Sequence, residues 1–212
     1  MGDLADRQLN DLLPRSFYAR DVLAVAPRLL GAVVEHETRD GLVAVRLTEV
    51  EAYAGSADPA SHAYRGQTRR NATMFGPAGH AYVYFTYGMH WCMNLVCGRS
   101  GVAEAVLLRA GEVVAGHELA RTRRAGCSDR DLARGPARLT MALGIDRGHD
   151  GLDVTDAALP LRVRRGRRLA AARIRTSART GVVSAAEHPW RFYVEGEPTV
   201  SPYRPPVARR RR

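Results

Sequence analysis

The chain has 212 residues, of which 45% are hydrophobic, and this suits one sizeable core in a single domain rather than two large domains. It carries 32 basic and 22 acidic residues, so its formal net charge of +10 favours a polyanionic partner over a neutral metabolite. No apolar run is long enough to span a bilayer, and the first residues are too polar for a secretory signal. We therefore expect a soluble cytoplasmic protein that does not bind membranes, associated with the nucleoid if the source is bacterial.

The sequence contains no lysine, so all 32 of these basic residues are arginine. A Schiff base on a side chain requires a lysine amine, so that chemistry is excluded for every side chain, and only the N-terminal amine could replace it. The three cysteines, Cys92, Cys97 and Cys127, lack the paired spacing of zinc or iron–sulfur sites. We expect neither a disulfide scaffold nor a metal or other cofactor.

The hydrophobic pattern predicts an α+β fold with a mainly antiparallel sheet. Segments typical of strands lie at 32–37, 42–51, 81–87, 90–96, 104–110, 169–175 and 191–195. Segments typical of helices lie at 22–30, 112–124 and 136–143. Residues 54–79 are polar and lack a sustained period, so they predict a long irregular loop of the kind that often carries function.

We expect one domain with a tail at each end. Residues 1–13 are the predicted N-terminal tail, and residues 14–200 are the predicted domain. Residues 201–212 are rich in proline and end in four arginines, which predicts a disordered cationic tail.

Two carboxylates and a tyrosine lie at the end of the second predicted strand. Because side chains alternate along a strand, Glu49, Glu51 and Tyr53 are expected on one face. A solvated strand face is one interpretation, since glutamate is mostly exposed. A catalytic site is the other, since residues at strand ends beside long loops are often catalytic.

Aromatic side chains are concentrated in residues 82–91, which read YVYFTYGMHW. A hairpin of this kind can pack its rings in the core, or it can stack some rings on nucleobases and insert another into the base stack. Tyr87, beside the turn at Gly88, is placed for insertion, whereas Tyr84 points to the opposite face and could line a pocket. The loop at 61–71 carries three arginines and a histidine, which could contact phosphate or be solvated.

Taken together, these motifs resemble one family, the 3-methyladenine DNA glycosylases of the alkyladenine (alkylpurine) type. The resemblance extends from Pro14 to Val200 and rests on several segments in order. They are EVEAY (49–53), SHAYRGQTRRN (61–71), MFGP (74–77), YVY (82–84), YGMHWCMN (87–94), VLLRA (106–110), GPARL (135–139) and RFYV (191–194).

The resemblance implies a curved sheet with flanking helices and a protruding β-hairpin that inserts into DNA. It also implies a monomer without metal that acts on double-stranded DNA containing damaged purines. Such an enzyme flips alkylated or deaminated purines out of the duplex and removes them by hydrolysis, 3-methyladenine above all, with hypoxanthine and ethenoadenine as further candidates. The abasic site that it leaves is passed to downstream processing enzymes.

The resemblance also implies roles for individual residues, carried over by motif position. Glu51 is expected to activate water for attack on the sugar. The pocket for the flipped base is expected to comprise Tyr53, His62, Tyr84 and Asn94. Tyr87 and Met89 are expected to insert into the duplex. Arg65 and Arg70 are expected to contact phosphate. Arg109 is expected either to contact phosphate or to support Glu51.

Two other functions are compatible with the same residues. A non-catalytic nucleic-acid-binding module could use the aromatic hairpin and the arginine surface. A metalloenzyme could use His62, His80 and His90, although these lack acidic or cysteine partners at ligand spacing. Only the glycosylase predicts that Glu51→Gln keeps DNA binding and loses turnover. Because lysine is absent, we expect such an enzyme to have no lyase activity.

Overall fold

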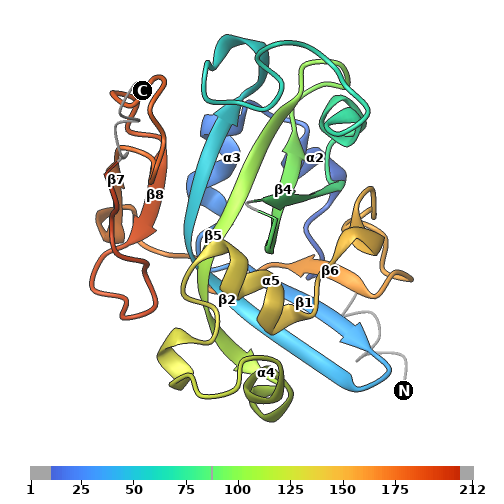
Figure 1. The fold of residues 1–212 in the computed structure, drawn as a ribbon, viewed down its shortest axis with the longest axis vertical. Coiled ribbons are helices and arrows are strands. Elements are labelled where there is room, and N and C mark those ends of the chain that lie inside the picture. The colour runs from blue at the N-terminus through green and yellow to red at the C-terminus, as the bar shows by residue number, and fades with distance from the viewer. Residues whose placement is uncertain (1–10, 87, 206–212) are drawn as a thin grey trace.

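The computed structural model describes residues 11–86 and 88–205 as an α+β fold built on one eight-stranded sheet (Figure 1). The strands are β1 (Val33–Thr38), β2 (Gly41–Ala54), β3 (Ala81–Thr86), β4 (His90–Cys97), β5 (Glu104–Ala115), β6 (Leu161–Arg164), β7 (Ile174–Ser177) and β8 (Arg191–Val194). The helices are α2 (Arg15–Tyr18), α3 (Val22–Leu29), α4 (His117–Arg123) and α5 (Pro136–Leu143), with 3-10 turns η1 (Gly55–Ala57), η2 (Ala72–Phe75), η3 (Asp129–Asp131), η4 (Arg147–His149) and η5 (Ala171–Arg173). The predicted single-domain α+β class is confirmed.

The sheet has the order β3-β4-β5-β2-β1-β6, and β8 pairs with both β2 and β7. All these pairings between described strands are antiparallel. The long strand β2 is the centre, because β5 follows one of its edges while β1 and β8 share the other. Residues 41–46 of β2 pair with β1, and residues 49–51 pair with β8. The half of β2 that carries the two glutamates is therefore flanked on both sides.

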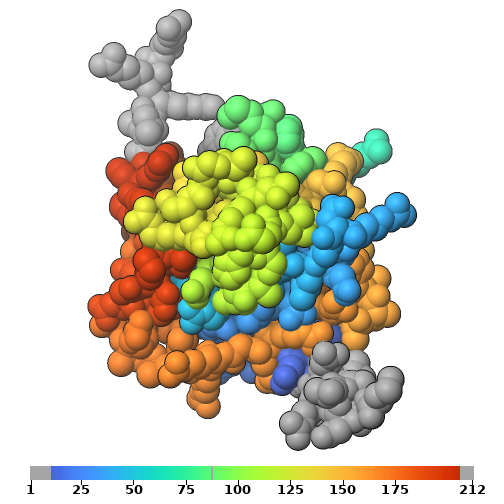
Figure 2. Space-filling model, turned by 90° about the horizontal axis from the view of Figure 1, so that it is seen from below, coloured from blue at the N-terminus to red at the C-terminus, as the bar shows by residue number. Residues whose placement is uncertain are grey.

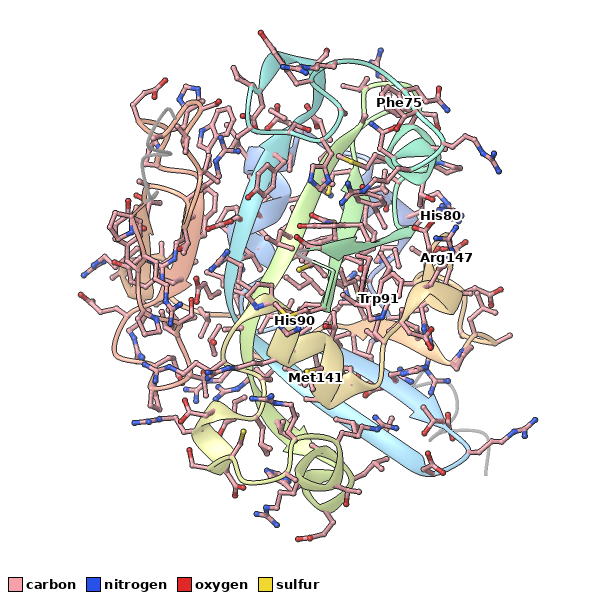
Figure 3. All side chains as sticks on the ribbon, in the orientation of Figure 1. Phe75, His80, His90, Trp91, Met141 and Arg147 are labelled. Carbon is pink, nitrogen blue, oxygen red and sulfur yellow. The ribbon has the colours of Figure 1, made fainter. Side chains whose placement is uncertain are left out.

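Two helices cover opposite faces of the sheet, α3 behind it and α5 in front of it in the view of Figure 1. Asp21 caps α3 by accepting a hydrogen bond from the backbone N–H of Leu23 at 2.8 Å. The helix then buries the apolar positions that the sequence predicted. The prediction for α5 is also confirmed, with Pro136 in its first turn. Its Thr140 hydroxyl donates to the carbonyl of Trp91 on β4 at 2.8 Å, and Figure 3 labels His90 and Trp91 of β4 and Met141 of α5 in this region.

The helix predicted at 112–124 is wrong in its first part, because β5 continues to Ala115. Val113 pairs with Val45 of β2 and is buried, so tertiary pairing overrides the helical pattern. The strand is followed by Gly116, whose φ is +73° and where a Cβ atom would lie 2.0 Å from the carbonyl oxygen of Leu42. Helix α4 begins only after this glycine.

Two further strand predictions need correction. Residues 161–164 form β6, although the basic stretch there gave no strand signal. Their arginines are accommodated because Arg162 and Arg164 pair with Glu37 and Glu35 of β1 at 2.8 and 2.6 Å. The strand predicted at 169–175 begins later, at Ile174. The intervening segment, orange in Figure 2, crosses the molecule from the β6 side to the β7 side.

Both predicted tails contain residues that pack on the domain. Leu13 is buried and donates its backbone N–H to the carbonyl of Val163 at 3.0 Å. Ser201 is also buried and hydrogen-bonds to Glu49. Most of the two predicted tails, residues 1–10 and 206–212, lies outside the described residues. The packed part therefore extends past both of the boundaries expected from the sequence.

Candidate active site

Glu51 lies at the centre of the candidate site, on the half of β2 flanked by β5 and β8, and its side chain is fully buried. Its Oε2 accepts hydrogen bonds from the Tyr53 hydroxyl at 2.9 Å and from Nη1 of Arg109 at 3.2 Å. Its Oε1 accepts one from the backbone N–H of Thr180 at 2.7 Å. A carboxylate has about four lone-pair positions, so one position on Oε1 is left by the described residues.

Arg109 reaches Glu51 because β5 is irregular opposite the two glutamates. Glu49 pairs with Ala110, and the next residue of β2 pairs with Leu108, so Arg109 is an extra residue in β5. A bulge of this kind re-aims a side chain. The Arg109 guanidinium donates from Nε to Glu49 at 2.8 Å as well as from Nη1 to Glu51. Of the two roles expected for Arg109, its contacts in the structure are those of support for Glu51.

Glu49 is as buried as Glu51 but accepts four hydrogen bonds. Its Oε1 accepts from Nε of Arg109, from Nε of Arg191 at 2.7 Å and from the Ser201 hydroxyl at 2.9 Å. Its Oε2 accepts from the backbone N–H of Ser201 at 2.6 Å. Burial alone would raise the pKa of Glu49, but the charges of Arg109 and Arg191 hold it below its usual value. Neither glutamate therefore belongs to a solvated strand face.

A cavity of about 260 Å³ opens beside Glu51. Its lining includes four predicted pocket residues, Tyr53, His62, Tyr84 and Asn94. It also includes three residues to which the sequence gave no pocket role, Tyr82, Cys92 and Thr180, together with Arg109. Glu51 is absent from the lining, but all three of its hydrogen-bond donors contribute to it. The carboxylate therefore lies one layer behind the cavity wall.

Aromatic rings form much of this wall. The rings of His62 and Tyr84 meet edge to face with centroids 4.6 Å apart, and Tyr82 stacks on Tyr84 at 5.4 Å. Burial raises the pKa of Tyr82 to about 12 and raises those of Tyr84 and Tyr53 as well. All three hydroxyls thus stay protonated at neutral pH and can donate hydrogen bonds.

The loop that carries His62 is anchored by Asn71, a buried residue that sequence reasoning did not single out for this role. Asn71 Nδ2 donates to the carbonyls of His62 at 2.9 Å and Gly66 at 3.1 Å, while its Oδ1 accepts from the backbone N–H of Thr68 at 2.6 Å. Partial desolvation, followed by the charge of Arg70, lowers the pKa of His62. The imidazole in the cavity is therefore predominantly neutral at pH 7.

Arg179 is a second functional candidate that the sequence did not reveal. It is fully buried and donates from Nη2 to Oδ1 of Asp58 at 2.8 Å and from Nη1 to the carbonyl of Ala52 at 3.0 Å. Its guanidinium carbon lies 4.6 Å from the ring centroid of Tyr53 and 5.1 Å from that of Trp190. Arg179 thus packs on the ring of Tyr53 without being among the described residues that line the cavity. Nothing distinguishes it in the sequence from the many other arginines.

The residues expected to contact DNA are exposed to different extents. Met89, in the turn between β3 and β4, is 69% exposed. Tyr87 lies outside the described residues. Arg65 is exposed in the 61–71 loop. Arg70 donates to the carbonyl of Phe85 on β3 at 2.9 Å, and its guanidinium carbon lies 5.8 Å from the ring centroid of Tyr84.

The structure does not bring together the three histidines of the metalloenzyme hypothesis. His62 lies in the cavity wall. Nδ1 of His80 lies 3.4 Å from Nη1 of Arg15, and His90 is the first residue of β4 (Figure 3). Within residues 11–86 and 88–205, no three His, Cys, Asp or Glu side chains gather in a way that could hold a metal ion. Of the helices in this part of the chain, none has the length and apolar character of a membrane span.

The comparisons with known proteins agree with the resemblance seen in the motifs. A family model described as "Methylpurine-DNA glycosylase (MPG)" matches residues 16–198. A protein of Streptomyces avermitilis, named "Putative 3-methyladenine DNA glycosylase", is 56% identical over 203 residues, covering 94% of this chain and 95% of the relative. Proteins of Frankia casuarinae and Burkholderia lata with the same name are 53% and 48% identical, covering 90% and 99% of this chain and 92% and 99% of their own lengths. The chain belongs to the methylpurine-DNA glycosylase family.

Proposed function

We propose that this protein is a 3-methyladenine DNA glycosylase that hydrolyses the bond between a damaged purine and its deoxyribose. The observation that carries the proposal is the position of Glu51, a buried carboxylate with one free acceptor position, directly behind an aromatic cavity. At about 260 Å³ the cavity is smaller than the pockets of about 300 Å³ and more that hold drug-sized ligands, which suits a single base.

The substrate base must leave the duplex to reach this cavity. Extrusion costs a few kcal/mol and is easiest at damaged or mismatched pairs. Stacking on Tyr53 and Tyr84 would offset part of that cost, since base–aromatic stacking contributes about 1–3 kcal/mol per base. Asn94 would lie where the amino group of guanine clashes, so that undamaged guanine is disfavoured. His62, whose ring meets that of Tyr84 edge to face, would close the side of the pocket next to Tyr84.

Glu51, rather than Glu49, is the general base in this mechanism. Two arginines donate to Glu49 and hold its pKa down, whereas all three donors to Glu51 line the cavity and Oε1 of Glu51 retains one acceptor position for water. A glutamate is a competent base at neutral pH. Water adds to the sugar carbon, its proton passes to Oε1, and the base leaves with the electrons of the glycosidic bond. The negative carboxylate also stabilises the oxocarbenium-like sugar of the transition state.

Alkylated purines leave readily because alkylation makes them good leaving groups. Hypoxanthine and ethenoadenine are neutral and require protonation of the base, so 3-methyladenine is the first substrate to expect. Because no side chain can form a Schiff base, the product is an abasic site in an intact strand.

The DNA would be held by the elements around the cavity mouth. Tyr87 and Met89 at the turn between β3 and β4 would insert into the gap left by the flipped base. Arg65 and Arg70 would contact phosphates on either side of the lesion. The enzyme is proposed to act as a monomer, as the resemblance to the family implies.

The proposal is tested by single-turnover excision on three labelled duplexes that carry a stable 3-methyladenine analogue, hypoxanthine or ethenoadenine. Strand breaks that appear only after alkali, and that Glu51→Gln abolishes, would support a monofunctional glycosylase and rank its lesions. Breaks without alkali would contradict the absence of lyase activity. Binding to all three duplexes without excision would replace the proposal with a non-catalytic nucleic-acid-binding module.

A further inference from the structure

The segment that follows β8 is fastened at three successive residues. The Thr199 hydroxyl lies 2.9 Å from that of Thr48 on β2. The carbonyl of Val200 accepts from Nε of Arg134 at 2.9 Å, and Ser201 bonds to Glu49. None of these three segment residues is part of the cavity lining that the described residues form. The contacts of this segment are therefore with the residues behind the cavity and not with the space for the base.

Ser201 commits all of its polar groups to one ionic cluster. Its N–H and hydroxyl both donate to Glu49, at 2.6 and 2.9 Å, and its carbonyl accepts from Nη2 of Arg191 at 2.8 Å. Arg191 in turn donates from Nε to Glu49 at 2.7 Å. The three residues form a closed ring of hydrogen bonds in the interior, and this ring fixes the plane of the Glu49 carboxylate.

The orientation of Glu49 is transmitted to Glu51 through one planar group. The Arg109 guanidinium donates from Nε to Glu49 and from Nη1 to Glu51. Because guanidinium is flat and rigid, fixing the bond at Nε determines where Nη1 points. A displacement at Glu49 therefore changes the contact at Oε2 of Glu51, and with it the direction of Oε1.

We infer that Ser201 is a positioning residue for glycosidic hydrolysis, acting through Glu49 and Arg109 on the orientation of Glu51. This inference rests on the proposed function of Glu51. Ser201 touches neither the base nor the water in this scheme. Its effect is on the rate of the chemical step rather than on DNA affinity.

The test compares Ser201→Ala with a matched control, Thr155→Ala. Thr155 also donates both its N–H and its hydroxyl to one carboxylate, that of Asp153, at 3.0 and 2.6 Å, but this pair is outside the cavity lining and the Glu51 contacts. We expect Ser201→Ala to lower the single-turnover rate roughly 3- to 10-fold, because one bond to a charged group is lost. The Kd for a duplex with an uncleavable lesion analogue should stay within about twofold. Thr155→Ala should leave both the single-turnover rate and the Kd unchanged. Ser201→Thr keeps the hydroxyl donor and should have a rate close to that of the wild type.

A second background separates positioning from general destabilisation. Lysine cannot bridge two carboxylates with the geometry of guanidinium, so Arg109→Lys cuts the connection between Glu49 and Glu51. In that background Ser201→Ala should have no further effect on the rate. An unchanged rate for Ser201→Ala alone, or an equal loss in both backgrounds, would overturn the inference and leave the proposed function intact. A wild-type rate for Glu51→Gln would overturn both.

Discussion

Glu49 and Glu51 lie two residues apart on β2, both fully buried, yet Glu49 accepts four hydrogen bonds and Glu51 only three. Arg109 connects the two carboxylates through different nitrogens of one guanidinium. Glu49 is held between two arginines, Arg109 and Arg191, whereas all three donors to Glu51 line the cavity, so we expect only Glu51 to accept a proton from water there.

The Tyr53 hydroxyl supplies one of the three bonds to Glu51, so its removal tests how far the orientation of the carboxylate matters. Tyr53→Phe keeps the ring between Arg179 and the cavity and removes only the donor. We expect the single-turnover rate to fall roughly tenfold, with Kd for lesion duplex nearly unchanged. Tyr82→Phe is the comparison, since the Tyr82 hydroxyl contacts His62 instead of Glu51. Equal rate losses in both variants would contradict the account.

The buried pair of Arg179 and Asp58 supports the cavity, and its loss should be costly. Arg179→Met leaves the Asp58 carboxylate buried and unpaired, so the free energy of unfolding should fall by about 3–5 kcal/mol in urea titrations. The double variant Arg179→Met/Asp58→Asn removes both charges and should recover part of that loss. A decrease below about 1 kcal/mol for the single variant would show that the pair does not stabilise the fold as described.

A chain of imidazole hydrogen bonds makes stability depend on pH. His36 Nδ1 lies 2.8 Å from the carbonyl of Leu143 and must carry a proton, so its Nε2 accepts from Nε2 of His149 at 3.1 Å. His149 Nδ1 lies 2.9 Å from Oδ1 of Asp146 and 3.1 Å from the backbone nitrogen of the same residue. Burial, and then the neighbouring charges of His149 and Arg123, lowers the pKa of His36. The folded state therefore requires the neutral ring.

A group whose folded pKa is lowered contributes stability that is present above its unfolded pKa and is lost as the pH falls. For His36 the unfolded value is about 6.5. We expect Tm to be flat above about pH 7 and to fall as the pH drops below about 6.5. His36→Asn, which can retain the donor to Leu143, should flatten this dependence, leaving the contribution of His62. A slope identical to wild type would rule out His36 as its source.

Arg65 is exposed in the loop beside the cavity and is expected to contact phosphate. Arg65→Gln should reduce the slope of log K against log salt for duplex binding by about 0.9, the value for one phosphate contact. The single-turnover rate at saturating enzyme should not change. Arg121→Gln is the control, because Arg121 on α4 is paired with Asp129 of η3 at 2.8 Å. Identical salt slopes for wild type and Arg65→Gln would remove this residue from the DNA surface.

The sequence predicted the features that depend on local pattern. Strand alternation placed Glu49 and Glu51 on one face, and the two carboxylates do meet the same arginine. The motifs also selected four residues that the structure brings to one cavity, although their contact with a base remains a prediction. The insertion of Tyr87 and Met89 into DNA likewise remains a prediction.

The features that the sequence did not predict depend on contacts between distant segments. Thr180 and Ser201 reach Glu51 and Glu49 across 129 and 152 positions, from segments without hydrophobic periodicity. The bulge at Arg109 is a property of two paired strands, so one strand alone does not reveal it. The continuation of β5 to Ala115 was missed for the same reason, because its pairing with β2 overrides local helical preference.

The most direct test of the central claim is the single-turnover excision rate of Glu51→Gln on a duplex carrying a stable 3-methyladenine analogue, with Kd measured on the same preparation. Loss of a general base lowers rates by about 10²–10⁴-fold, so the account predicts a decrease of at least about 100-fold with Kd within about threefold of wild type. A variant that excises the base within about tenfold of the wild-type rate, while it binds the duplex normally, would contradict the assignment of Glu51 as the base that activates water.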